Sequence, residues 1–293
     1  MAETNEHTLR LRPGRLDDAE EAGRIIFEAF STIAEKHGFP SDFPSVNVGI
    51  STAASFLSKP GFYSVVAEDI SNGKLVGSNF VDERSNIAGV GPIAVDPNYQ
   101  NKGVGRQLMN NVMERAKNKN FPGTRLLQAS YHNRSLALYA SLGFEIREPI
   151  STMQGRPIQE VIPGRTVRPA AESDVKSCNA ICKAVHGHNR NGELVDSIKQ
   201  GSAKVVLRAN RITGYTSGMA FFNHSVGLTN DDLRALIGSA DSYGGPGILI
   251  PTRNTQLFHW CLDKGLRLVQ QLILMTVGMY NEPAGAYMPS VLY

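Results

Sequence analysis

A pair of glycines at the start of one helical stretch is the feature of this sequence best suited to chemistry. Gly103 and Gly105 open a segment whose apolar residues recur at helical spacing as far as Lys117. The first turn of a helix attracts anions, because its N–H groups lack intrahelical partners at the positive end of the helix dipole. Glycines let a diphosphate approach the backbone, and Lys102 adds a positive charge. Glycine spacing alone is equally typical of helices that begin with glycine for steric reasons.

The sequence around the glycines predicts the strands and helices that must position them. Phe62–Asp69 and Lys74–Asp82 are predicted strands, joined by an Asn-Gly hairpin turn. Val90–Val95 is a third strand, and Pro92 inside it indicates an edge or a bulge, because proline removes a ladder donor. The remaining predicted elements of this region are the helix Gly103–Lys117, the strand Arg125–Tyr131, the helix Ser135–Leu142 and a strand opening at Phe144–Glu148.

Two landmarks of the first half recur in the second half. Arg12-Pro13, followed by acidic residues and an apolar helical stretch, is echoed by Arg168-Pro169. The helix end and strand start around Gly143 are echoed around Gly265, and the second half is shorter between the landmarks. We therefore predict two copies of one α/β unit, joined by a segment rich in Gly and Pro. The predicted domains are residues 1–160 and 161–293.

Composition places the chain among ordinary globular proteins. Its 293 residues are 41% hydrophobic and 19% charged, which excludes a disordered or fibrous protein. The formal charge of +3 is spread along the chain, without a basic block for nucleic acid or a membrane surface. Three cysteines are too few for a disulfide framework, and no signal peptide or membrane-spanning apolar run is evident. We expect a cytoplasmic protein that binds neither nucleic acid nor membrane.

The longer segment around the glycines resembles a known family signature. Gln100-x-x-Gly103-x-Gly105 follows the run from Gly91 to Pro97 and precedes a long amphipathic helix. A second element, Asn133 with Leu138-Tyr139-x-x-x-Gly143-Phe144, comes later in the chain. Together they resemble the acyl-coenzyme A signature of the GNAT N-acetyltransferase superfamily, across essentially the whole first copy. The tail Asn281–Tyr293 is similar to that of tandem bacterial GNAT proteins.

The resemblance implies a fold, a co-substrate and a set of site residues. It implies an α/β fold of two GNAT-like domains, each a mixed, mainly antiparallel twisted sheet flanked by helices. Acetyl-CoA is the implied co-substrate, and Tyr139 is the implied acid that protonates the departing thiolate. The implied coenzyme-binding residues are Ile93, Ala94 and Val95 along the pantetheine, Gln100, Lys102, Gly103, Val104, Gly105 and Arg106 around the diphosphate, and Asn133.

The second copy lacks these features. No Gln-x-x-Gly-x-Gly occurs after Gly164, and Cys261 stands where the first copy has Tyr139. Thr229 or Asn230 is predicted to cap a helix there instead. We therefore expect a degenerate second copy that binds no coenzyme, and that shapes the acceptor pocket if the copies pack like a dimer. The polar residues that could contribute are Arg253, Asn254 and His224.

Several acidic and basic residues are candidates for handling the acceptor. An alkylamine must lose a proton before it attacks a thioester, so a base is needed. Glu83 is the predicted catalytic base, with Asp82 and His132 as alternatives, and each also suits a polar residue at a strand end or turn. The segment from Ser31 to Lys59 is either a wall of the acceptor pocket or a proline-pinned surface loop. Its candidate contacts are Glu28, His37, Phe39 and Phe43.

One cluster could also bind metal. Cys178, Cys182, His186 and His188 could present zinc ligands from one helix face, but the two cysteines also belong to that helix's apolar stripe. We predict no metal site.

The sequence thus predicts an enzyme that transfers an acetyl group from acetyl-CoA to a primary amine, by direct transfer in a ternary complex. A small-molecule amine is the predicted acceptor, and the protein is predicted to be a monomer, folded as an intramolecular pseudo-dimer, or a homodimer. Two alternatives stay open: a non-catalytic acyl-CoA sensor, and an enzyme that acetylates a protein or peptide amine.

Overall fold

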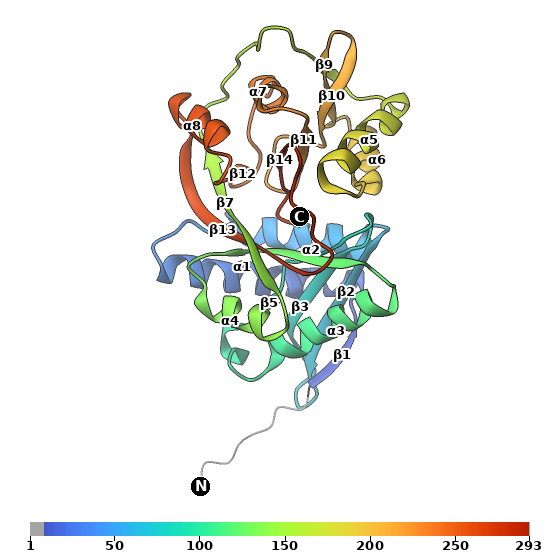
Figure 1. Ribbon diagram of the computed structural model, residues 1–293. Helices are drawn as coiled ribbons and strands as arrows, with labels where there is room; N and C mark the ends of the chain where they lie inside the picture. Colours follow the sequence, from blue (N-terminus) through green and yellow to red (C-terminus); the bar gives the residue numbers. More distant parts are fainter. Residues whose placement is uncertain (1–8, 293) are drawn as a thin grey trace. The chain divides into compact units, whose positions relative to one another are not determined.

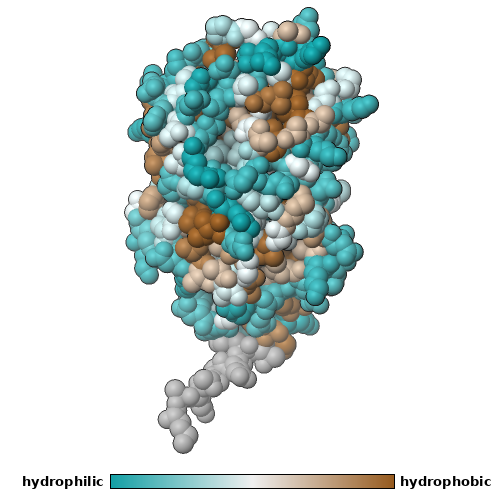
Figure 2. Space-filling model, viewed as in Figure 1, coloured by the Kyte–Doolittle hydropathy of each residue, from teal (hydrophilic) through white to brown (hydrophobic). Residues whose placement is uncertain are grey.

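The computed structural model describes residues 9–292, which fall into two compact units (Figure 1). Unit 1 takes in the described residues up to Glu83 together with residues 88–124, and unit 2 comprises residues 84–87 and those from Arg125 onward. Hydrophilic residues cover most of the face shown in Figure 2. Among residues 9–292, no helix combines the length and the apolar character needed to cross a membrane.

Unit 1 is built around an antiparallel sheet. In chain order its elements are β1 (Leu9–Pro13), η1 (Leu16–Asp18), α1 (Ala19–Lys36), α2 (Val46–Ser58), β2 (Phe62–Asp69), β3 (Lys74–Asp82), β4 (Ala88–Val90), β5 (Ala94–Val95), η2 (Pro97–Tyr99) and α3 (Val104–Asn118). Strands pair in the order β1-β2-β3-β4, and β5 also pairs with β3. Strand β6 (Gly123–Ala129) begins in unit 1 and continues in unit 2.

Helices cover both faces of this sheet. The side-chain amide of Asn79 on β3 lies 3.4 Å from Met109 Sδ on α3. The ring of the next residue, Phe80, lies 5.6 Å from that of Phe56 on α2. Successive side chains of a strand point to opposite faces, so α3 and α2 lie on opposite faces of the sheet. Helix α1 packs tightly on α2, because a Cβ at Gly23 would come within 2.3 Å of the α2 backbone.

Most predicted elements of the first half are present, with two corrections, one of which is that the predicted strand Val90–Val95 is divided into β4 and β5. Strands β2 and β3 have the predicted bounds, and α3 is displaced by a single residue. The segment 31–59, expected to be a pocket wall or surface loop, is mainly helical, because α1 continues to Lys36 and α2 occupies Val46–Ser58. Ser45 caps α2 by accepting a hydrogen bond from the Val48 amide (3.4 Å). This serine and the apolar residues that follow it at helical spacing are the signal from which α2 could have been predicted.

Unit 2 contains two sheets and five helices among its described residues. In chain order its remaining elements are α4 (Asn133–Ser141), β7 (Glu145–Gln154), β8 (Thr166–Pro169), η3 (Glu172–Asp174), α5 (Val175–His186), α6 (Asn191–Lys199), β9 (Lys204–Arg208), β10 (Arg211–Thr216), β11 (Ser225–Gly227), α7 (Asn230–Gly238), β12 (Ile248–Pro251), α8 (Thr255–Asp263), β13 (Arg267–Gly278) and β14 (Ala286–Met288). One sheet has the order β6-β13-β7-β12 and the other has the order β14-β11-β10-β9-β8.

The last long strands of the two sequence halves exchange places. Strand β13, from the second half, lies between β6 and β7. Strand β7, from the first half, pairs on its other edge with β12 of the second half, with Ile150 opposite Pro251. Contacts therefore do not divide the chain near residue 160, where the sequence echo places the junction between copies. The copy boundary stays a prediction about the repeat, while the compact units follow the strand pairing.

The first sequence echo corresponds to one local structure formed twice. Arg12 Nη2 donates to Asp18 Oδ1 at 2.7 Å, and Arg168 Nη2 donates to Asp174 Oδ1 at 2.9 Å. In each case the aspartate ends a 3-10 turn that leads directly into a helix, α1 or α5. The matching contacts and element order support two copies of one α/β unit.

Candidate functional site

The predicted anion-binding turn is formed at the start of α3. Gly103 adopts a left-handed conformation with φ of 80°, which an L side chain rarely adopts. The first intrahelical hydrogen bond runs from the Gln107 amide to the Gly103 carbonyl at 3.1 Å, so the amides of Val104–Arg106 precede the helical ladder. A Cβ built on Gly103 would meet no atom within 4 Å. Open space therefore lies directly beside Gly103.

The strand before this turn carries the predicted bulge. Val81 pairs with Val90, whereas Ser78 pairs with Ala94, so the register shifts across residues 91–93, where Pro92 lies. Within the described chain, β3 is the only strand paired with β5. The other edge of β5 has no partner strand among the described residues, and a ligand could bind there like an added strand by displacing the Gln100 side chain from the Val95 carbonyl oxygen.

Two side chains of the predicted diphosphate loop have defined contacts. Gln100 Nε2 donates to the Val95 carbonyl oxygen at 3.3 Å, which ties the loop back to β5. The Lys102 ammonium lies 4.9 Å from the centre of the Tyr99 ring, within range of a cation–π interaction. Lys102 is itself solvent-exposed. The cation is therefore held close to the start of α3, where the sequence predicted it.

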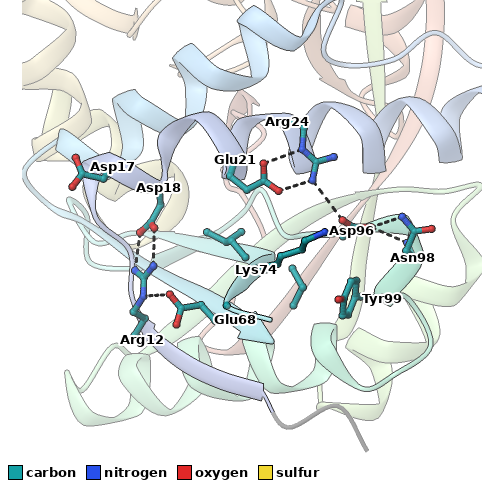
Figure 3. Close-up of a pocket in the computed structure, with 13 residues that line it drawn as sticks. Arg12, Asp17, Asp18, Glu21, Arg24, Glu68, Lys74, Asp96, Asn98 and Tyr99 are labelled. Carbon is teal, nitrogen blue, oxygen red and sulfur yellow. Dashed lines mark hydrogen bonds and ion pairs between the residues drawn. The ribbon is translucent and has the colours of Figure 1, made fainter. Parts of the chain in front are cut away.

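Beside the loop lies a cavity of about 580 Å³ within unit 1 (Figure 3). Its charged lining is largely paired. Arg24 contacts Glu21 at 2.6 Å and approaches Asp96 at 3.5 Å. The two carboxylates of Glu21 and Glu28 raise the pKa of Arg24, first through their hydrogen bonds. Asp96 in turn accepts a hydrogen bond from the Asn98 amide at 2.8 Å. This network joins α1 to the segment that leads into α3.

The predicted base, Glu83, lies in an ion-pair cluster. Its carboxylate accepts hydrogen bonds from Arg115, one of them 2.9 Å long, and lies 3.3 Å from Lys119 Nζ. Burial raises the pKa of Glu83, but the hydrogen bonds and charges of Arg115 and Lys119 outweigh it and lower the pKa overall. A carboxylate held ionised by two cations is a weaker base. These contacts hold Glu83 in a structural ion-pair cluster, and its predicted catalytic role stays a prediction.

The predicted acid, Tyr139, belongs to unit 2. It is 6% exposed and its ring lies 6.1 Å from that of Phe144, so it packs as a helix aromatic. Burial raises the pKa of Tyr139, which keeps the phenol protonated at neutral pH. Asn133 is the exposed first residue of α4. The raised pKa also makes the phenol a weaker acid, and the catalytic role of Tyr139 stays a prediction.

The remaining acceptor candidates have mainly structural contacts. Phe43 is buried and packs edge-to-face on Phe30 with ring centres 5.1 Å apart. Glu28 binds Arg24 at 2.5 Å, and His37 Nδ1 lies 2.9 Å from the Ile33 carbonyl oxygen. These contacts account for the side chains of Phe43, Glu28 and His37 without an acceptor.

The two other candidate bases and Phe39 lie at or near the ends of secondary-structure elements. Asp82 is buried at the end of β3, and His132 precedes α4 at its N-cap. Phe39 is half-buried after α1. The roles predicted for these residues stay predictions.

In the second half, the helix that corresponds to α3 has a different start. Helix α3 follows β5, which pairs with β3, the second strand of the β2–β3 hairpin. In the same way, helix α7 follows β11, which pairs with β10, the second strand of the β9–β10 hairpin. The residue that caps α7 is Thr229, one of the two predicted alternatives. The carboxylate of Asp232 accepts hydrogen bonds from the Thr229 amide at 3.0 Å and from the Thr229 hydroxyl at 2.8 Å. Asp232 is 1% exposed and also binds Arg165 at 2.7 Å. A buried carboxylate therefore occupies this helix start, and the expectation that the second copy binds no coenzyme stays a prediction.

The polar residues singled out in the second half are also engaged. Arg253 binds Glu148 at 3.1 Å, and Asn254 exchanges side-chain hydrogen bonds with Asn230. His224 is buried, with Nδ1 lying 2.7 Å from Glu193 Oε1. Their predicted contribution to an acceptor pocket stays a prediction.

The zinc alternative has no support in the described part of the chain. Cys178 and Cys182 pack in the core with Ile181 and Val185. Among residues 9–292, no group of three or more His, Cys, Asp or Glu side chains is arranged to hold a metal ion.

Two residues of this region escaped the sequence analysis. The Tyr99 hydroxyl donates to Asp69 Oδ2 at 3.0 Å, so a side chain of the loop is bonded to the end of β2. Tyr99 lies inside the signature segment, but its type gives no hint of its partner. Asp69 is thirty residues away along the chain, and only the fold brings the two together.

Comparisons with known proteins agree with this geometry. Residues 27–144 match the Acetyltransferase (GNAT) family. A protein from Pyrococcus horikoshii described as an acetyltransferase is similar in structure, with TM-score 0.72, 20% identity, and 95% of this chain and 94% of that chain covered. A GCN5-related N-acetyltransferase from Sphaerobacter thermophilus gives TM-score 0.61 and 15% identity, covering 94% and 96% of the two chains. No curated protein matches the sequence. At these identities the structural likeness establishes the fold.

Proposed function

Because residues 27–144 are a domain of the acetyltransferase (GNAT) family, we propose that this protein transfers the acetyl group of acetyl-CoA to a primary amine of a small molecule. One observation carries the proposal most directly. Helix α3 begins at a left-handed Gly103 with open space beside it, and Lys102 lies next to that start. A helix start of this kind suits a diphosphate.

The proposed roles of the chain follow from its own groups. The amides of Val104–Arg106 and the ammonium of Lys102 would hold the diphosphate by charge-assisted hydrogen bonds. The edge of β5 that faces away from β3 would pair with the amides of the pantetheine arm. The thioester supplies an activated acyl group with a thiolate as leaving group.

Direct transfer is favoured over a covalent acyl-enzyme by the state of the cysteines. The chain contains three, Cys178, Cys182 and Cys261, and all are buried. Burial raises the pKa of Cys178 and of Cys261 to about 12, so neither thiol forms a nucleophilic thiolate at neutral pH. The acceptor amine is therefore proposed to attack the thioester itself, with Tyr139 protonating the departing sulfur.

Titration calorimetry with CoA and acetyl-CoA tests the binding part of the proposal. A panel of primary amines assayed for thiol release from acetyl-CoA tests the transfer. Tyr139→Phe should slow amine-dependent release about 10- to 100-fold while leaving CoA affinity unchanged, because only the proton donor is removed. Cys261→Ala, at the corresponding position of the second half, is the matched control and should keep the wild-type rate.

Three results would contradict parts of the proposal. Absence of CoA binding by the folded protein rejects it altogether. CoA binding without release for any amine favours the sensor alternative. A wild-type rate in Tyr139→Phe removes Tyr139 from the mechanism.

A further inference from the structure

The segment between β5 and α3 is held at its first end by Asp96. The Asp96 amide donates to the Val76 carbonyl oxygen at 2.9 Å, and its carboxylate accepts from the Asn98 amide at 2.8 Å. Arg24 of α1 approaches the same carboxylate at 3.5 Å, as Figure 3 shows. These contacts fix where the segment leaves the sheet, but they do not reach Lys102 at its other end.

The centre of the segment is held by Tyr99. Its hydroxyl donates to Asp69 Oδ2 at 3.0 Å and accepts from Asn72 Nδ2 at 3.2 Å. Asp69 is fully buried, and its other oxygen accepts from the Ser71 amide and hydroxyl at 2.9 and 2.6 Å. The carboxylate thus joins the β2–β3 hairpin turn to the loop. Hydrogen bonds to a buried carboxylate are stronger than those between neutral groups, so this anchor is rigid.

The same tyrosine also carries the cation of the loop. Lys102 Nζ lies 4.9 Å from the centre of the Tyr99 ring. Lysine has a long flexible stem, and ordering it on binding a ligand costs conformational entropy. A ring fixed by Asp69 beneath the ammonium reduces the number of positions that the ammonium samples before a ligand arrives.

We propose that Tyr99 is a positioning residue for the diphosphate site: bonded to Asp69 and stacked under Lys102, it preorganises the loop that starts α3. This inference rests on the proposed function, because it assumes that the α3 start binds the coenzyme diphosphate. Tyr99 itself need not touch the ligand. Its effect on affinity is exerted through Lys102 and through the backbone of the loop.

Calorimetric titration of the full-length protein with CoA tests the inference. Tyr99→Phe removes the hydrogen bond to Asp69 and keeps the ring, and should raise the Kd about 3-fold. Tyr99→Leu removes both and should raise the Kd about 10-fold. Lys102→Met alone should raise the Kd and make its dependence on salt shallower, because one cation leaves the site.

A double-variant cycle measures whether the effects of the Tyr99 and Lys102 substitutions on the Kd depend on each other. A purely structural role of Tyr99 predicts that they do not. If Tyr99 acts through Lys102, adding Tyr99→Leu to Lys102→Met should raise the Kd less than Tyr99→Leu does in the wild type. Tyr99→Phe, which keeps the ring under Lys102, should retain the wild-type salt dependence, whereas Tyr99→Leu should make it shallower, because Lys102 is then less closely held at the site.

Unit 1 contains a matched control. The Tyr63 hydroxyl donates to Asn111 Oδ1 at 2.9 Å, and the Arg115 guanidinium lies 3.9 Å from the centre of its ring. Tyr63→Phe and Tyr63→Leu therefore remove the same kinds of contact away from the loop, and should leave the Kd for CoA unchanged.

The possible outcomes separate this inference from the proposed function. Wild-type affinity in Tyr99→Leu, or strictly multiplicative effects of Tyr99→Leu and Lys102→Met, overturns the inference while the proposed function stands. An equal loss of affinity in Tyr63→Leu overturns it as well, because the effect is then general to the unit. Absence of CoA binding by the wild-type protein overturns both.

Discussion

Helix α3 of the first half and helix α7 of the second half occupy corresponding places in the chain but begin in opposite ways. Helix α3 starts from a left-handed glycine with no side-chain cap and an exposed lysine before it. Helix α7 starts from Thr229, and the buried carboxylate of Asp232 accepts the hydrogen bonds of that turn. An open helix start attracts an anion, whereas one filled by a carboxylate repels it. The difference supports the proposal that the coenzyme binds to the first half.

The strands before these helices, β5 and β11, also differ, because only the second has a partner strand on both edges. Strand β5 pairs with β3 and with no other strand of the described chain. Strand β11 pairs with β10 on one edge and with β14, from the C-terminal tail, on the other, with Val226 opposite Tyr287. An edge that already has a partner strand cannot accept a pantetheine arm in the same way. In the second half, the chain's own tail and its own carboxylate therefore fill the positions that the first half leaves open.

Removing the carboxylate of the second half should have the largest effect. Asp232→Asn removes the 2.7 Å ion pair with Arg165, which keeps a 4.0 Å contact with Asp231, and weakens the hydrogen bond from Thr213, so unfolding should become easier by about 3 kcal/mol. Urea unfolding measures this change, while CoA affinity should stay at the wild-type value. Asp231→Asn is the control, because the Asp231 carboxylate is half-exposed, lies 4.0 Å from Arg165 and pairs with Arg234 near the surface, and it should change stability little. A second CoA-binding site in Asp232→Asn would show that the Asp232 carboxylate alone prevents the second half from binding CoA.

Placing a carboxylate at the first-half helix should have the next largest effect. Arg106 occupies in α3 the third helical position that Asp232 occupies in α7. Arg106→Asp should raise the Kd for CoA about 10- to 100-fold, because it exchanges a favourable charge for a repulsive one beside the diphosphate. Lys117→Asp makes the same change of charge at the exposed far end of the helix and should have a much smaller effect. Equal effects of the two variants would reject a site at the helix start.

The smallest effect is expected for Glu83, which the sequence analysis predicted to be the catalytic base. Glu83→Gln should lower stability at neutral pH by about 1 kcal/mol, because the contacts with Arg115 and Lys119 lose their charge. The pKa of Glu83 is lowered in the folded protein, so its contribution is present above the ordinary glutamate pKa and is lost as pH falls through the folded-state value. The stability difference between the wild type and Glu83→Gln should therefore disappear in acid.

Glu114→Gln is the control for that measurement, because Glu114 is exposed on α3. It should leave stability unchanged at every pH. A large loss of amine-dependent turnover in Glu83→Gln, at unchanged stability, would restore Glu83 as a candidate base.

Part of the site could be predicted from the sequence because its signals are local. The glycines at the start of α3, the Asn-Gly turn between β2 and β3 and the proline bulge each act through a few neighbouring residues. The role of Glu83 could not be predicted, because its cations, Arg115 and Lys119, come from the far end of α3. The Tyr99–Asp69 anchor was missed for the same reason.

The sequence by itself determined the helical periods, the turns, the duplicated Arg–Asp opening and the family signature, since short-range sterics and capping decide these features. The tertiary structure alone decided which strands pair. Strands β13 and β7 exchange between the sequence halves, and β14 takes the edge of β11. A strand pattern specifies one buried face but not the neighbour on each edge, because backbone hydrogen bonds are the same for every partner. The choice of neighbour depends on the packing of the complete chain.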